Sequence, residues 1–172
     1  KDHTIEELLP LFLLLLKDDN HEARLNIICK LDAVNEVIGV DCLAQSLLPA
    51  IIELAEDKQW RVRLAIIEHI PLLASQMGVK FFEERLAKMC IMWLCDSVYT
   101  IREAAAENLR KLTEVFGVQW ASMYITPQVH ELCSHSNYLY RMTAVLAIST
   151  LASSMGRDKL KTMLDAVLSA TK

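Results

Sequence analysis

Two His-Glu dipeptides, His21-Glu22 and His130-Glu131, are the residues of this chain best suited to hold a metal ion. Paired dipeptides of this kind supply imidazole and carboxylate ligands to di-iron centres in some helical-repeat proteins. Their spacing argues against such a centre, because residues 21 and 130 are 109 apart, which is not a multiple of the 39-residue interval at which the chain repeats. One dipeptide is expected at a turn and the other on a helix. We therefore predict no metal site and no cofactor.

The cysteines do not form a reactive pattern either. The five of them make an odd set without a C-x-x-C pair, and Cys90 and Cys95 have no histidine close by in the sequence. The chain also has no H-E-x-x-H, no glycine-rich phosphate loop and no G-x-S-x-G. We expect a protein that is not an enzyme, in the cytoplasm or also the nucleus, where thiols stay reduced and pack as small hydrophobic side chains.

The composition indicates an all-α protein. Of the 172 residues, 53% are hydrophobic, but only 4 are glycine and 4 are proline, too few for the turns of a many-stranded sheet. A net charge of −4 gives no basic surface for nucleic acid and suits an anionic membrane poorly. The longest apolar run, Leu8 to Leu16, is about half as long as a membrane-spanning helix, and no secretory signal pattern opens the chain. We expect neither a nucleic-acid nor a membrane partner.

The chain repeats itself every 39 residues. Glycines, arginines and aspartates each recur at this interval without insertion or deletion, at Gly39, Gly78, Gly117 and Gly156, at Arg24, Arg63, Arg102 and Arg141, and at Asp18, Asp57 and Asp96. Within each unit, apolar residues recur three and four apart in two blocks, which is the pattern of two amphipathic helices. A repeat of this length predicts an array of helical hairpins.

We expect four hairpins and a final single helix, in units of about 1–39, 40–78, 79–117 and 118–156 with a partial unit at 157–172. The first helices are expected near 4–16, 43–55, 81–94, 121–133 and 159–170, and the second helices near 21–37, 60–76, 99–115 and 138–154. Each glycine is expected just past a second helix, in the left-handed conformation. Asp19, Ser97 and Ser136 are expected to cap second helices.

Proline in the first helix, with aspartate and arginine at fixed places around the turn, makes the unit resemble a HEAT repeat. The prolines are Pro10, Pro49 and Pro127, each expected to kink its helix. The resemblance implies an α-α superhelix, an armadillo-like solenoid that forms one domain over residues 1–172.

Several stretches resemble one HEAT family in particular, the 65-kDa scaffold (A) subunits of protein phosphatase 2A. These are LNII (25–28), NEVIG (35–39), SLLPAI (46–51), WRVRLAIIE (60–68), IREAA (101–105) and NYL (137–139). The similarity runs from about Leu8 to Met155 and aligns with the carboxy-terminal half of the scaffold. It implies a segment of a longer array that acts as a non-catalytic scaffold. Its intra-repeat turns would form a ridge that binds the catalytic subunit, whereas regulatory subunits would bind repeats absent here.

The first position of each second helix carries a flat side chain: His21, Trp60, Tyr99 and Tyr138. Residues at equal phase in a solenoid form a line along one edge, and large flat side chains dominate binding hot spots. We therefore interpret these residues as a partner-binding ladder. The alternative is that each ring packs beneath its turn and joins one repeat to the next.

The resemblance also selects the neighbours of these rings as candidates. Trp60 and Arg61 match the phosphatase-binding turn of the scaffold family. That family has a lysine directly before the tryptophan, whereas here Gln59 intervenes and the lysine is Lys58. The candidate protein-binding residues are Lys58, Trp60, Arg61, Val98, Tyr99, Asn137, Tyr138 and Leu139.

The phased arginines are interpreted as structural, since they can bridge repeats by hydrogen bonds to carboxylates and free carbonyls. His135 stands where the fourth aspartate would be and should weaken that end. Trp93 and Trp120 are interpreted as packing residues. Two other functions stay open: a HEAT-type transport or assembly adaptor that binds cargo on its concave face, at positions such as Glu68 and Glu107, and a segment with no partner of its own.

Overall fold

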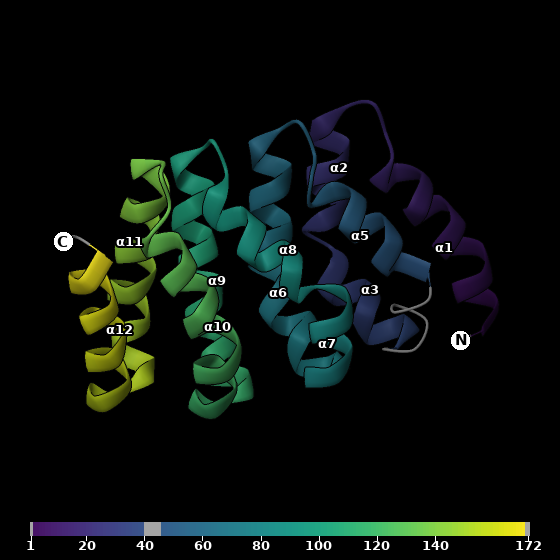
Figure 1. The fold of residues 1–172 in the computed structure, drawn as a ribbon. Coiled ribbons are helices and arrows are strands. Elements are labelled where there is room, and N and C mark those ends of the chain that lie inside the picture. Colours follow the sequence, from purple (N-terminus) through teal and green to yellow (C-terminus); the bar gives the residue numbers. More distant parts are fainter. Residues whose placement is uncertain (1, 40–45, 171–172) are drawn as a thin grey trace. The chain divides into compact units, whose positions relative to one another are not determined.

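The computed structural model describes residues 2–39 and 46–170, apart from the side chains of residues 2–6, 32, 35, 38, 166, 167 and 170. All regular structure in these ranges is helical, which confirms the all-α class (Figure 1). The chain divides into two compact units, residues 1–70 and 71–172, with the boundary inside one helix. The expectation of a single array over the whole chain stays a prediction.

The first unit contains α1 (Asp2–Leu16), α2 (His21–Ile28), α3 (Leu31–Ile38), α5 (Leu48–Leu54) and the start of α6 (Trp60–Met77). Helix α1 packs against α2 and α5. The second helix expected near 21–37 is interrupted, because the N–H of Lys30 donates to the carbonyl of Ile27 at 2.9 Å and tightens the turn before α3 begins. Leu16, Ile28 and Ile51 are fully buried in this unit.

The second unit contains α7 (Val79–Arg85), α8 (Ala87–Met92), the short 3-10 helix η2 (Trp93–Cys95), α9 (Tyr99–Phe116), α10 (Val118–Cys133), α11 (Tyr138–Met155) and α12 (Arg157–Ala170). Helix α11 packs against both α9 and α10, and α12 packs against α10 and α11. The first helix expected near 81–94 is broken at Leu86, whose φ of −118° leaves the helical range while its side chain is fully buried. In the second unit the hairpin pattern is otherwise as the periodicity predicts, whereas the start of the first helix expected near 43–55 lies outside the described residues.

Each second helix begins at the residue that carries its flat side chain. Helices α2, α6, α9 and α11 start at His21, Trp60, Tyr99 and Tyr138, as predicted. The predicted caps are wrong by one residue. Asn20 caps α2 and Asn137 caps α11, each accepting a hydrogen bond from the N–H two residues on, at 2.9 and 3.0 Å. Val98, which precedes α9, forms no side-chain cap.

A single glycine joins each second helix of the second unit to the helix that follows. Gly117 has φ 91° and ψ 162°, so its ψ is extended and the predicted left-handed conformation is wrong. In practice only glycine adopts this combination of a positive φ and an extended ψ. The Gly117 N–H donates to the Thr113 carbonyl at 2.9 Å, and its own carbonyl accepts from the N–H of Ala121 at 3.2 Å. The residue thus ends α9 and starts α10 without a loop.

The prolines occupy two kinds of position. Pro10 and Pro127 lie inside α1 and α10, as predicted, and Pro71 lies inside α6. Pro49 instead lies in the first turn of α5, so the prediction of a kink there is wrong. A missing N–H costs little at that place, because the first N–H groups of a helix have no partner within the helix.

Both tryptophans of the second unit pack, as predicted. Trp93 is 3% exposed. The Trp120 Nε1 donates to the Glu83 carboxylate at 2.9 Å, and its ring stacks on Tyr124 with the centroids 5.6 Å apart. Phe82 and Phe116 complete this aromatic cluster around the connection at Gly117.

The cysteines follow the expectation in part. Cys90 and Cys133 are buried and Cys95 is half-buried, but Cys29 is exposed, so the prediction is wrong there. Cys42 lies outside the described residues. Burial raises the pKa of the Cys90 thiol to about 12, although the neighbouring Asn108 side chain opposes the shift. Such a thiol is protonated at neutral pH and therefore a poor nucleophile.

Asn108 is the buried polar side chain that the structure leaves least satisfied. It is 2% exposed on α9, and within the described ranges neither atom of its carboxamide makes a hydrogen bond of normal geometry, although the Cys90 thiol is close by. Burying an amide without a partner costs about 1 to 3 kcal/mol. Replacing this buried amide by an apolar side chain of similar shape should therefore stabilise the protein.

Asn108→Leu is expected to raise the free energy of unfolding by about 1 kcal/mol, because it removes this cost at similar volume. Urea unfolding followed by circular dichroism measures the change. Thr113→Val is the matched control on the same helix, since the buried Thr113 hydroxyl donates to the Leu109 carbonyl at 2.8 Å and its loss should not stabilise. An Asn108→Leu protein less stable than the parent would contradict this account.

Candidate functional site

In each intra-repeat turn, one side chain accepts a hydrogen bond from the backbone N–H two residues further on. In the first unit, Asp18 accepts from the N–H of Asn20 and Asp57 accepts from the N–H of Gln59, both at 2.8 Å. In the second unit, Asp96 accepts from the N–H of Val98 at 2.8 Å, and the Nδ1 of His135 accepts from the N–H of Asn137 at 3.0 Å. These bonds set the backbone that leads into each second helix.

The phased arginines also stabilise these turns, by hydrogen bonds to backbone carbonyls. Each guanidinium donates through Nη1 to two backbone carbonyls in the turn that precedes its own helix. Arg24 reaches the carbonyls of Asp18 and Asp19 at 2.6 and 3.1 Å, and Arg102 reaches those of Asp96 and Ser97 at 2.8 and 3.1 Å. Arg63 and Arg141 make the corresponding bonds. The predicted hydrogen bonds to free carbonyls are confirmed, but they lie within each arginine's own repeat and do not by themselves bridge two repeats.

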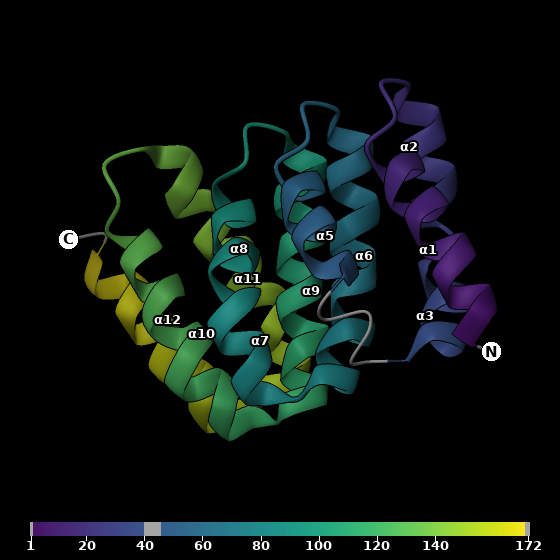
Figure 2. The ribbon, with the colours of Figure 1, turned by 90° about the vertical axis from the view of Figure 1, so that its right-hand side faces the viewer.

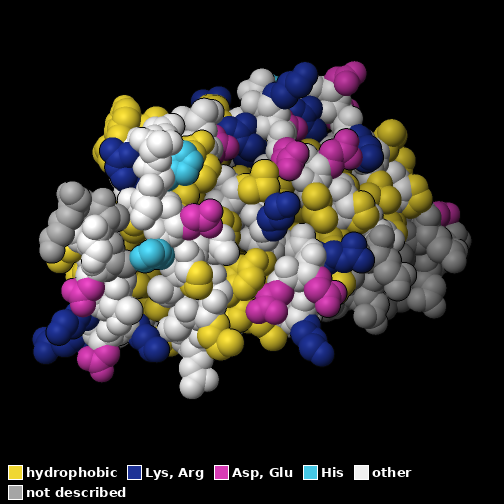
Figure 3. Space-filling view, viewed as in Figure 1, with side chains coloured by type: hydrophobic (Ala, Val, Ile, Leu, Met, Phe, Trp, Pro, Cys, Tyr) yellow, Lys and Arg dark blue, Asp and Glu magenta, His cyan; other side chains and the backbone are white. Residues whose placement is uncertain are grey.

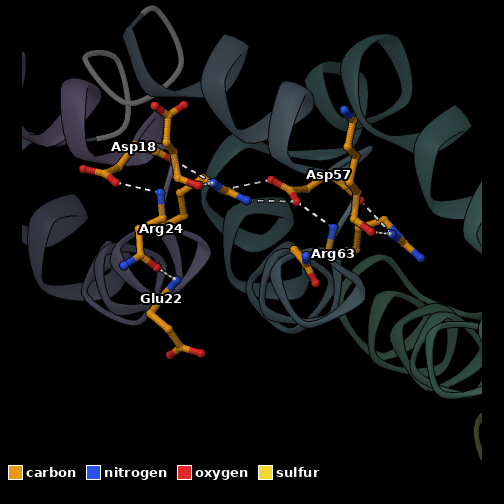
Figure 4. A network of polar contacts seen from close by, with 9 residues as sticks. Asp18, Glu22, Arg24, Asp57 and Arg63 are labelled. Carbon is orange, nitrogen blue, oxygen red and sulfur yellow. Dashed lines mark hydrogen bonds and ion pairs between the residues drawn. The ribbon is translucent and has the colours of Figure 1, made fainter.

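One of these arginines also joins two repeats. The Arg24 guanidinium lies between its own turn and the next one, with Nη2 at 3.2 Å from Oδ1 of Asp57 and Nε at 3.0 Å from Oδ2 (Figure 4). The two side chains are only 13% and 11% exposed, so solvent screens this ion pair little. The two turns of the first unit are therefore held at a fixed spacing.

The equivalent link is absent from the described part of the second unit. Arg102 is 9% exposed and makes no ion pair among the described residues, because position 135, one repeat on, is a histidine. His135 keeps the turn-closing hydrogen bond of the aspartates but not their charge, and its ring packs on Tyr140 with the centroids 4.4 Å apart. Where His135 replaces the fourth aspartate, the inter-repeat ion pair is therefore missing among the described residues, whereas the turn keeps its hydrogen bond.

His135→Asp is expected to restore that pair and to raise the free energy of unfolding by about 1 kcal/mol, since Arg102 is already held in place and largely shielded from solvent. His135→Asn is the matched control: it keeps an acceptor for the turn but adds no charge, so it should change the stability little. Chemical unfolding at low and high salt measures both. An equal effect of the two substitutions would contradict the role given to charge.

The flat side chains at the turns divide into two groups. Trp60 is half-buried and carries the Arg61 guanidinium over its ring at 4.8 Å from the centroid, while Arg61 itself is exposed. Tyr99 and Tyr138 are 56% and 60% exposed, too much for rings that pack beneath a turn. His21 is half-buried and pairs with Glu22 at 3.2 Å. The packing alternative therefore applies in part to His21 and Trp60 and not to the two tyrosines.

The other candidate residues surround these rings. Lys58 and Asn137 are exposed, and Val98 and Leu139 are half-buried. The Asn137 side chain is occupied as the cap of α11, a structural role that was not expected from the sequence. In the first unit the turns after α1 and α5 lie on one edge, and in the second unit those after η2 and α10 do so (Figures 1 and 2). Each unit thus presents its candidates along one edge, and their role in binding stays a prediction.

The structure adds one exposed apolar residue to the turn edge of the second unit. Met142 is 62% exposed and lies one helical turn after Tyr138 on α11. The sequence signal was present, since residues four apart share a helix face. It was missed because an apolar residue inside a helix is interpreted as core by default.

The described residues hold no group of three or more His, Cys, Asp and Glu side chains that could bind a metal ion. His130 lies in the last turn of α10, and His21 opens α2. Acidic and basic side chains are interspersed among hydrophobic ones on the face drawn in Figure 3. No helix in the described ranges combines the length and the apolar character that crossing a membrane requires.

Comparison with known proteins gives two matches. The model of the PIK3R4-like, middle domain family matches residues 1–170. A stretch of 37 residues is 65% identical to the beta isoform of the 65 kDa regulatory subunit of serine/threonine-protein phosphatase 2A from Homo sapiens, and it makes up 22% of this chain and 6% of that protein. The scaffold resemblance is thus supported over a much shorter stretch than residues 8–155. With nearly its whole length matched by one family model, the chain belongs to the PIK3R4-like, middle domain family.

Proposed function

We propose that this chain is a non-catalytic scaffold segment that binds the catalytic subunit of a type 2A serine/threonine phosphatase through its intra-repeat turns. The observation that carries the proposal is the exposure of phased aromatic and cationic side chains at those turns. Tyr99 and Tyr138 are more than half exposed, and Arg61 covers Trp60. The 37-residue match to a phosphatase 2A regulatory subunit supports the choice of partner. Regulatory subunits of such a complex would bind repeats outside this chain.

The turns are suited to binding because they are held rigidly. The aspartate and arginine hydrogen bonds fix both sides of each turn before a partner arrives. A preformed surface loses little conformational entropy on association, and large flat rings lose little rotamer freedom. The same proposal places the chain in the cytoplasm or the nucleus, which the free thiols of Cys29, Cys90, Cys95 and Cys133 support.

The adaptor alternative receives less support. Glu107 is engaged by Arg110, which donates to its carboxylate from Nε at 2.9 Å and from Nη2 at 2.6 Å. This hydrogen bonding lowers the pKa of Glu107, and Arg110 also contacts Glu114. A cargo that used Glu107 would have to break this pair. The glutamate is therefore better explained as part of a surface ion-pair network.

Biolayer interferometry with the purified phosphatase catalytic subunit over the immobilised chain tests the proposal. Saturable binding that is unchanged in a Glu68→Gln/Glu107→Gln variant is the expected result. No saturable signal from a folded chain would overturn the choice of partner. Binding that is lost in the Glu68→Gln/Glu107→Gln variant would favour the adaptor alternative.

A further inference from the structure

Arg102 on α9 is a largely buried cation without a carboxylate partner among the described residues. It is 9% exposed, and its Nη1 donates to the carbonyls of Asp96 and Ser97 at 2.8 and 3.1 Å. Within the part of the chain that the structure describes, neither its Nε nor its Nη2 donates a hydrogen bond, and neither nitrogen is fully buried. Removing a charge from water without pairing it is unfavourable, so these two donors are suited to bind an anion.

The first unit shows what such a guanidinium binds. Arg24 holds its own turn in the same way, with Nη1 at 2.6 and 3.1 Å from two backbone carbonyls. Its Nε and Nη2 then bind the two carboxylate oxygens of Asp57 at 3.0 and 3.2 Å (Figure 4). Because a guanidinium is planar, fixing Nη1 also fixes the direction of the other donors. Nε and Nη2 of Arg102 are therefore directed to the place that a carboxylate would take one repeat on.

His135 stands at that place and offers Arg102 no acceptor. Its Nδ1 already accepts from the N–H of Asn137 at 3.0 Å, so the neutral ring carries its proton on Nε2. The ring itself packs on Tyr140. Arg102 and His135 both lie inside the second unit, with the helices on either side of them described. The unmet donors are therefore a property of this repeat and not of an end of the sequence.

We propose that Arg102 binds a carboxylate of the partner protein, from an aspartate or glutamate side chain that takes the place Asp57 holds at Arg24. The inference rests on the proposed function and names the chemistry that the phosphatase catalytic subunit would bring to this turn. A carboxylate is favoured over other anions because its two oxygens match the two donors, as they do at Arg24.

The surroundings of Arg102 are suited to a binding hot spot. The guanidinium carbon lies 5.5 Å from the centroid of the Tyr99 ring, which is 56% exposed, and Tyr138 opens the next second helix at 60% exposed. A partner seated on these rings would shield the ion pair from water, which strengthens a charge-assisted hydrogen bond. A partner that placed an apolar or cationic side chain there would leave the arginine unpaired, so the site also contributes specificity.

His135→Asp tests the proposal, because it supplies Arg102 with an internal carboxylate that competes with the carboxylate of the partner. We expect the affinity for the purified catalytic subunit, measured by biolayer interferometry, to fall by about ten-fold while the free energy of unfolding rises. His135→Asn leaves the guanidinium unpaired and should bind as the parent does. A variant that gains stability and loses affinity separates a binding role from a purely structural one.

Ser136→Asp controls for the added negative charge. Asp19 holds the equivalent position in the first unit, and its carboxylate makes no ion pair among the described residues. An aspartate at position 136 should therefore add charge to the edge without pairing with Arg102, and we expect it to lose clearly less affinity than His135→Asp. Equal losses in the two variants, or unchanged affinity in His135→Asp, would overturn the proposal.

An acetate titration tests the site without the phosphatase. In nuclear magnetic resonance spectra of the chain with isotope-labelled arginine, sodium acetate at constant ionic strength should shift the Nε–H signal of Arg102. The signal of Arg24, which Asp57 already occupies, should not move, and the Arg102 shift should be lost in His135→Asp. An Arg102 signal that responds to inorganic phosphate and not to acetate, or to neither, would overturn the choice of a carboxylate. No phosphatase binding by the parent chain would instead overturn the proposed function, while this titration would still decide whether Arg102 binds carboxylates.

Discussion

Replacing Trp60 and Arg61 together by alanine is expected to weaken binding of the phosphatase catalytic subunit by about thirty-fold or more. Hot-spot residues at interfaces cost about 2 kcal/mol or more on truncation, and tryptophan and arginine are the types most often found there. The guanidinium over the indole makes the two side chains one platform, so we expect the single substitutions to be non-additive. Interferometry with the parent and the three variants measures these losses.

Because Trp60 is half-buried, its substitution can impair folding as well as binding, and the two effects must be measured separately. Arg61→Ala alone removes an exposed cation and should fold normally while losing part of the affinity. Lys88→Ala/Met92→Ala is the matched control, because it removes an exposed cation and an exposed apolar residue that lie on α8 and not in an intra-repeat turn. Full affinity in a folded Trp60→Ala/Arg61→Ala protein would remove these residues from the site.

Gly117→Ala is expected to lower the free energy of unfolding of the second unit by roughly 1 to 3 kcal/mol, the usual cost of a side chain in so sparsely populated a region. An added Cβ would meet no atom within 4 Å, so the expected loss comes from the backbone conformation and not from a clash. Thermal unfolding followed by circular dichroism measures it.

Gly117→Asn decides which conformation causes the loss. Asparagine tolerates the left-handed helical region but not a positive φ with extended ψ. With φ 91° and ψ 162°, we expect asparagine to be as damaging as alanine. A Gly117→Asn protein nearly as stable as the parent would indicate a left-handed cap, the conformation that the sequence alone predicted.

The hairpin architecture could be predicted from the sequence because the same two-helix pattern recurs four times at an interval of 39 residues. Every second helix starts at its predicted residue, since the turn aspartates and the following flat residues recur together. Local breaks were not predictable in the same way. The interruption before Leu31 carries a hydrogen bond from Lys30 to Ile27 and the break at Leu86 a φ of −118°, and no glycine or proline in the sequence marks either place.

The turn chemistry was predicted only in outline. Arg24 and Asp57 could be assigned to inter-repeat contacts, because an arginine and an aspartate near the turns of adjacent repeats come close together. The hydrogen bond that each aspartate accepts from the N–H two residues on was missed, and so the caps were placed one residue early. The sequence favoured exposed rings at Tyr99 and Tyr138 but left the packed alternative open, because a ring at a helix start can fold under the turn or away from it.

Hydrogen-exchange mass spectrometry of the chain, free and bound to the phosphatase catalytic subunit, tests the scaffold proposal most directly, because it needs no substitution. Binding is expected to protect the peptides that contain Trp60 and Arg61, Tyr99, and Tyr138, while those that contain Glu68 and Glu107 exchange as before. Protection of the Glu68 and Glu107 peptides, with the turn peptides unchanged, would contradict it.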